Sequence, residues 1–61
     1  MKDRLLRLPE VEDTTGLKRS TIYQKAKQGL FPKPVKLTER SSAWRESEVQ
    51  AWVAGREVVN V

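Results

Sequence analysis

Apolar residues recur at helical spacing in residues 19–28. Ile22 and Ala26 lie four positions apart, as one inward face of a helix requires. Gly29 and Leu30 follow as a helix end with an apolar contact beyond it. The pattern predicts a helix with a polar outer face, made of Ser20, Gln24 and Lys27, with Arg19 and Tyr23 on one flank and Thr21, Lys25 and Gln28 on the other.

A short helix is predicted over residues 9–15. Pro9 suits the first turn, because its missing N–H would have no partner there. Gly16 tolerates the left-handed conformation in which helices end. The turn from Thr15 to Lys18 joins this helix to the next, and such a pair with a polar second helix is the signature of a helix-turn-helix. We expect the first helix to support the second, whose N-terminal side chains face outward.

Residues 34–45 have the periodicity of a strand pair. Pro32 and Pro34 exclude a helix at its start. Apolar and polar side chains then alternate over Val35, Lys36, Leu37 and Thr38. A polar tip at residues 39–42 precedes a return strand, in which we expect Trp44 to cover the core. The segment therefore predicts a two-stranded hairpin, a candidate wing.

A last helix is predicted over residues 47–56. Ser47 with Gln50 three positions later matches a capping box at the helix N-terminus. Side chains repeat at helical spacing over Val49, Trp52, Val53 and Arg56, of which Trp52 and Val53 are expected to close the core. The apolar tail, residues 58–61, is interpreted as a frayed end rather than an oligomerisation strand. The fold class is thus mainly α with a small β-hairpin.

The composition narrows the classes of function. The chain has 61 residues with no cysteine and no histidine, so disulfides, thiolate zinc sites and catalysis by a histidine base or a thiol are excluded. We expect one domain over residues 1–61 with a core at about 5–56, no enzyme activity, no metal and no cofactor. Neither a membrane-spanning run nor a signal-peptide core is visible, so we expect a protein that stays inside the cell.

The charges are distributed unevenly. Residues 18–45 carry eight Lys and Arg against one acid, Glu39, whereas residues 1–17 and 46–61 carry small net negative charges. The net charge of +4 therefore comes from the middle of the chain. A basic block of this kind indicates a surface that binds a polyanion, and its alternative is a solvated surface with clustered charge. A helix surface that meets phosphates must lack acids, and residues 18–38 contain none.

The candidate DNA contacts follow from these patterns. On and before the second helix they are Lys18, Arg19, Ser20, Thr21, Tyr23, Gln24 and Lys27; on the hairpin they are Lys36, Thr38, Arg40, Ser41 and Ser42. Gln24 suits adenine, Arg19 suits guanine or a phosphate, and Arg40 suits the minor groove. Each has the alternative of simple solvation. Trp44 and Trp52 are expected in the core rather than stacked on bases.

Four stretches together resemble the AlpA family of phage and prophage regulators: Arg7–Val11, Thr15–Tyr23, Gly29–Leu37 and Trp44–Trp52. The resemblance extends over residues 4–56. It implies a minimal winged helix-turn-helix, related to MerR-type proteins and excisionases, that binds duplex DNA in the bacterial cytoplasm at the nucleoid. Two positions depart from the family pattern. Lys18 stands where Ser or Thr is common, and the hairpin tip lacks glycine.

The function expected from residues and resemblance together is sequence-specific binding of double-stranded DNA by a transcriptional regulator. The second helix would enter the major groove and the hairpin would lie on the adjacent backbone or minor groove. The size of the domain favours cooperative self-association on repeated half-sites. The alternative is an excisionase-like architectural or protein-interaction module, with an integrase, a response regulator or RNA polymerase as partner. Single-stranded RNA binding is disfavoured, because the pattern shows no exposed aromatic platform.

Overall fold

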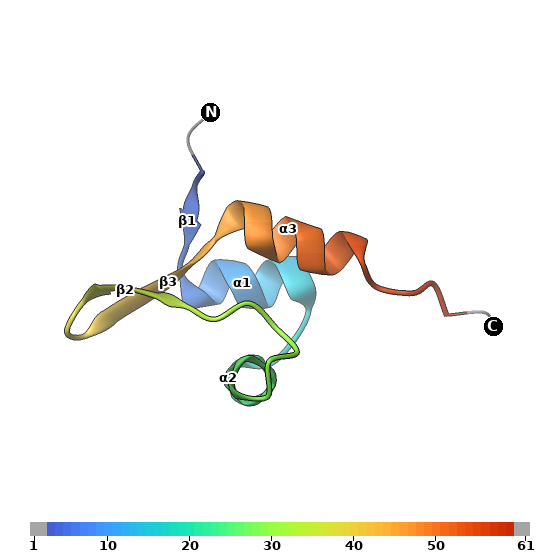
Figure 1. Ribbon diagram of the computed structural model, residues 1–61, viewed down its shortest axis with the longest axis horizontal. Helices are drawn as coiled ribbons and strands as arrows, with labels where there is room; N and C mark the ends of the chain where they lie inside the picture. The colour runs from blue at the N-terminus through green and yellow to red at the C-terminus, as the bar shows by residue number, and fades with distance from the viewer. Residues whose placement is uncertain (1–2, 60–61) are drawn as a thin grey trace.

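The computed structural model describes residues 3–59 and contains three helices and three strands (Figure 1). In chain order they are β1 (Leu5–Leu6), α1 (Leu8–Thr15), α2 (Arg19–Lys27), β2 (Val35–Thr38), β3 (Ser41–Arg45) and α3 (Glu46–Ala54). The three helices and the hairpin expected from the sequence are all present. The fold class is therefore confirmed, with one strand added to it.

The added strand, β1, turns the expected two-stranded wing into a three-stranded antiparallel sheet. Its order is β1-β3-β2, with β3 in the centre. Leu5 is opposite Arg45 and Leu6 is opposite Trp44. Leu6 is only 3% exposed, so burial of its side chain accompanies the pairing. Two residues are too few to show strand periodicity, which is why the sequence did not reveal β1.

Hydrogen bonds of side chains fix both ends of α1. At its start, the Glu10 carboxylate accepts the Arg7 backbone N–H at 3.2 Å and the Arg4 guanidinium at 2.6 Å. At its end, the Thr15 hydroxyl donates to the Val11 carbonyl at 2.7 Å. Gly16 then adopts φ 73°, the left-handed conformation expected of it, and its N–H donates to a carbonyl of the last turn. The chain therefore leaves α1 sharply toward α2.

The C-terminus of α2 differs in one respect from the sequence-based expectation. Gly29 adopts φ 78°, and the Leu30 N–H donates to the Lys25 carbonyl at 2.8 Å, which completes a Schellman motif. The apolar contact beyond the helix was assigned to Leu30, but this assignment is wrong because Leu30 is 57% exposed. Phe31, at 4% exposed, is the residue that turns into the core.

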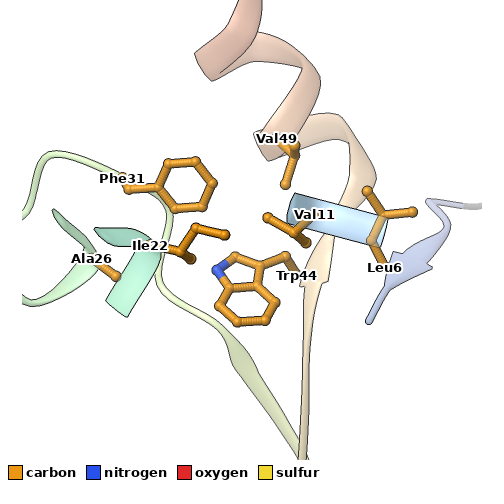
Figure 2. Packing of buried hydrophobic residues seen from close by; sticks show 7 residues of the cluster. All are labelled: Leu6, Val11, Ile22, Ala26, Phe31, Trp44 and Val49. Atoms are coloured by element: carbon orange, nitrogen blue, oxygen red, sulfur yellow. The ribbon is translucent and has the colours of Figure 1, made fainter. Parts of the chain in front are cut away.

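The core forms where all three helices meet the central strand (Figure 2). Its members are Leu6 of β1, Val11 of α1, Ile22 and Ala26 of α2, Phe31, Trp44 of β3 and Val49 of α3. Trp44 is fully buried, as expected, and its indole N–H donates to the Pro32 carbonyl at 2.9 Å. Burying one large side chain contributes about 1.5–3 kcal/mol. In so small a domain each core residue therefore carries a large share of the net stability.

The second tryptophan and its neighbour close the core only in part. Trp52 is half-buried, packs edge-on against Phe31 with ring centroids 4.9 Å apart, and donates its indole N–H to the Leu30 carbonyl at 2.8 Å. Val53 was also expected to be inside but is 36% exposed, so that expectation is wrong. The tail leaves the domain through exposed Val58 and Val59, and residues 60–61 lie outside the described part of the chain.

The N-terminus of α3 corrects the predicted capping box. Since β3 leads directly into α3, the helix begins at Glu46 and Ser47 lies inside its first turn. The Ser47 backbone N–H donates to Asp3 at 3.0 Å and its hydroxyl donates to the same carboxylate at 2.7 Å. These two hydrogen bonds lower the pKa of Asp3 below its usual value. The first turn of α3 is therefore capped from the start of the chain. The helix ends at Ala54, two residues before the expected end.

Candidate nucleic-acid interface

Burial of one face of α2 determines which side chains the helix exposes. Ile22 is fully buried and Ala26 is 4% exposed, as their spacing predicted. The polar side chains on the opposite face are exposed: Lys18, Arg19, Ser20, Gln24 and Lys27. Thr21 and Lys25, on one flank, are half-buried. The fold therefore presents the predicted polar face of α2 to solvent as one continuous strip.

The start of α2 has no side-chain cap. Lys18 occupies the N-cap position with extended backbone, and its carbonyl accepts the Ile22 N–H at 3.0 Å. No acid lies in the first turn of the helix. The positive end of the helix dipole thus stands beside the charges of Lys18 and Arg19, without a carboxylate to offset it. This arrangement attracts an anion to the exposed end of α2.

The wing turns without glycine, and β2 carries a bulge between Lys36 and Thr38. Lys36 is opposite Ser42 and Thr38 is opposite Ser41, so Leu37 has no partner on β3. The Arg40 backbone N–H donates to the Thr38 hydroxyl oxygen at 3.2 Å, and no non-glycine residue in the described part of the chain has a positive φ. The strict alternation expected over β2 is therefore wrong at Leu37, which is 42% exposed.

The candidate DNA contacts on the wing differ in solvent exposure. Lys36, Thr38 and Arg40 are exposed, whereas Ser41 and Ser42 are half-buried. Glu39 at the tip is exposed beside Arg40 and is the one acid between Lys18 and Arg45. The register places Thr38 and Ser41 opposite each other beside the tip, and Lys36 and Ser42 opposite each other nearer the base of the wing.

A surface hollow joins α2 to the wing. It is lined by Arg7, Leu8, Pro9, Tyr23, Arg40 and Ser42. Tyr23 is 46% exposed, and one side of its ring rests near the indole of Trp44, with ring centroids 5.8 Å apart. Three of the predicted site residues, Tyr23, Arg40 and Ser42, are therefore brought together here. Arg7 was missed, because it belongs to a segment of net negative charge and only the fold carries it to this place.

The basic side chains of the interface form no ion pair among residues 3–59. Among residues 3–59 the one ion pair joins Arg4 and Glu10, and no base of residues 18–45 takes part in it. In Figure 1, α2 lies at the lower side of the domain and α3, which carries Glu46 and Glu48, lies at the upper side. The structure therefore separates a basic α2 and wing from an acidic α3.

Over residues 3–59, no group of three His, Cys, Asp or Glu side chains is placed to hold a metal ion. In the same range no helix has the length and apolar character needed to cross a bilayer.

The α1–α2 pair, the third helix and the β2–β3 hairpin define a small winged helix-turn-helix domain. The chain belongs to the family described as Prophage CP4-57 regulatory protein (AlpA), which matches residues 4–57. The resemblance noted in the sequence is thereby confirmed. The family is one of regulatory proteins rather than enzymes, in agreement with the composition.

Two relatives show how far the similarity extends. An uncharacterized protein, ORF88 of Enterobacteria phage P4, is 51% identical over 55 residues, which cover 90% of this chain and 62% of the relative. The DNA-binding transcriptional activator AlpA of Escherichia coli K12 is 37% identical over 59 residues, which cover 87% of this chain and 84% of the relative. The chain thus spans less than two thirds of the phage P4 relative's length.

Proposed function

We propose that this chain is a sequence-specific, double-stranded DNA-binding regulator of prophage transcription. The observation that carries the proposal is the exposed face of α2, which is polar and basic, lacks acids and forms no internal ion pair within residues 3–59. The relative in E. coli is named as a DNA-binding transcriptional activator, which supports the same function here. A regulator of this kind acts on the chromosome in the bacterial cytoplasm.

In this proposal α2 enters the major groove, which admits one helix. Gln24 lies in the middle of the exposed face and pairs with the N6 and N7 atoms of an adenine. Arg19 contacts a guanine or a phosphate at the helix start. The remaining α2 contacts, from Lys18, Ser20, Thr21, Tyr23 and Lys27, go to the phosphate backbone. Base contacts then select the sequence, and backbone contacts hold the helix in register.

The wing lies on the adjacent backbone or minor groove. Arg40 at the tip reaches into the minor groove, where arginine is favoured by the negative potential. Lys36 and the hydroxyls of Thr38, Ser41 and Ser42 contact phosphates. Thr38 retains its hydroxyl hydrogen for this purpose, because its oxygen is the acceptor in the tip.

One domain of this size buries too little surface for tight binding alone. We therefore propose that two or more copies bind repeated or inverted half-sites cooperatively. Selection from a random duplex library at about 150 mM salt tests the proposal, because nonspecific attraction is weakened there. An enriched motif supports it, and the spacing of the motif counts the protomers. Absence of enrichment, with binding only at low salt, overturns it.

A second candidate function rests on apolar side chains outside the α2 face. Leu30 and Val53 are exposed near Trp52, and Val58 is 94% exposed beyond them. In this second function the chain is an excisionase-like module, and these side chains contact a protein partner such as an integrase, a response regulator or RNA polymerase. Substituting Leu30 and Val53 with Ser would then abolish regulation without changing DNA affinity. Loss of DNA affinity on Gln24→Ala and Arg19→Ala would instead favour the first function.

A further inference from the structure

The hollow between α1, α2 and the wing contains donors from three separate elements. Arg7 precedes α1, Tyr23 comes from the middle of α2, and Arg40 and Ser42 come from the wing. Leu8 and Pro9 form its apolar wall. No carboxylate is among the lining residues. The polar groups of the hollow are therefore two guanidinium groups and two hydroxyls, all of which donate hydrogen bonds.

The two guanidinium groups are free to take an external partner. Arg7 uses only its backbone in the cap of α1, where its N–H donates to Glu10 and its carbonyl accepts the Val11 N–H at 3.0 Å. Glu10 in turn is paired with Arg4, not with Arg7. Arg40 likewise uses its backbone N–H within the wing tip. No ion pair in the described range, residues 3–59, includes either side chain.

We infer that this hollow is a binding site for one phosphate of the DNA backbone, with Arg7 and Arg40 as its cations. Guanidinium groups bind phosphate oxygens in a forked geometry, and the Tyr23 and Ser42 hydroxyls supply further donors. The inference rests on the proposed function and deepens it: it adds Arg7, which lies outside both the recognition helix and the wing, and it assigns Arg40 to this phosphate in place of the minor groove. One DNA strand passes between α2 and the wing, and the hollow fixes its register against α1.

The first test compares two single charge removals. Arg7→Ala removes a cation of the hollow, and Arg56→Ala removes an equal charge beyond the C-terminal end of α3. Arg56 packs over the ring of Trp52 at 4.3 Å and lies outside the hollow. The Arg7 side chain takes no part in the hydrogen bonds or ion pairs of residues 3–59, so Arg7→Ala should leave the melting temperature unchanged. Any change in its DNA binding then reports on the contact.

We expect Arg7→Ala to weaken binding by about tenfold, as loss of a charged hydrogen bond does. The weakening should be equal on the selected and on an unrelated duplex, because phosphates carry no sequence information. The slope of log affinity against log salt should fall by about 0.9, the value for one phosphate. Arg56→Ala should change neither quantity. Equal behaviour of the two variants overturns the inference.

The second test locates the phosphate directly. Single methylphosphonates, which are neutral, are placed in turn along the selected duplex, and the affinities of wild type and Arg7→Ala are compared. We expect one position per half-site at which the methylphosphonate weakens DNA binding by the wild-type protein but not by Arg7→Ala. Two groups in direct contact show this non-additivity. Identical profiles overturn the inference while leaving the proposed function in place. If wild type selects no duplex sequence, the proposed function itself fails, and the inference with it.

Discussion

The carboxylate of Asp3 holds both the backbone N–H and the hydroxyl of Ser47, at 3.0 and 2.7 Å, across 44 positions of the sequence. The Glu46 N–H beside them donates to the Arg4 carbonyl at 2.7 Å. The start of the chain thereby supplies the N-terminal cap of α3, a role that short-range residues usually have. Because β1 follows at once, the same segment also extends the sheet.

Removing the charge of Asp3 should lower the stability in a pH-dependent way. Hydrogen bonds from Ser47 hold the pKa of Asp3 below its usual 3.8 in the folded protein. The stability from this carboxylate is therefore complete above pH 3.8 and is lost as the pH falls through the folded-state pKa. We expect Asp3→Asn to melt below wild type at pH 7 and to converge with it in acid. Thermal unfolding followed by circular dichroism measures this, with Asp13→Asn on α1 as control. A difference that stays constant with pH would contradict it.

Substitution of Gly16 should destabilise the α1–α2 turn through the backbone alone. Gly16 has φ 73°, and no atom of the described residues lies within 4 Å of an added Cβ. Gly16→Ala should therefore lower the free energy of unfolding by about 1–2 kcal/mol. In a domain of this size each kcal/mol corresponds to about 4–8 °C in melting temperature.

Gly55 offers the matched control for that substitution. Its φ of −84° is open to any residue, and an added Cβ would meet the Ala51 carbonyl oxygen at an ordinary 3.5 Å. Gly55→Ala should leave the melting temperature unchanged or raise it slightly. Equal losses in the two variants would show that the left-handed backbone of Gly16 is not the cause.

Gln24→Ala should reduce the preference of the protein for its selected DNA sequence more than it reduces the affinity for unrelated DNA. Loss of a two-hydrogen-bond contact to adenine removes about 1–3 kcal/mol of discrimination at one base pair. Fluorescence anisotropy on the selected duplex and on versions with single base pairs exchanged measures this. Gln50→Ala, an equal truncation of an exposed residue of α3, should have no effect. A uniform loss across all duplexes would place Gln24 away from the bases.

Glu39→Gln at the wing tip should strengthen binding to every duplex. Glu39 is exposed next to Arg40, and in the proposed complex its carboxylate would repel the phosphates beside the wing. Removal of this surface charge should raise the DNA affinity about two- to fivefold at low salt. Added salt should reduce this increase. Titrations at two salt concentrations measure it, with Glu48→Gln on α3 as the control that should not respond. Unchanged affinity would indicate that the wing tip stays away from DNA.

Local sequence patterns were sufficient to predict α2 and its exposed face. The spacing of Ile22 and Ala26 determines the inward face of α2, and Gly29 ends the helix within one residue of the expected position. The opposite face then follows from geometry alone. Trp44 was also placed correctly, because it is fully buried in the return strand of the hairpin.

Long-range contacts account for what the sequence did not reveal. β1 exists through its pairing with β3, in which Leu6 lies opposite Trp44, a residue distant in the sequence. Ser47 with Gln50 satisfied a local capping pattern, yet a carboxylate from the other end of the chain caps the helix. Arg7 joins the surface of Tyr23 and Arg40 only through folding. None of these contacts leaves a periodic signal in the residues that make them.

The most direct test of DNA-sequence recognition is the ratio of two dissociation constants at about 150 mM salt, a condition that suppresses nonspecific attraction. One is measured on the duplex selected from a random library and the other on a scrambled duplex of equal length. We expect a ratio of about 10³ or more, as sequence-specific DNA-binding proteins show. A ratio near one would mean that the basic surface binds DNA without distinguishing its sequence, which would contradict the proposed function.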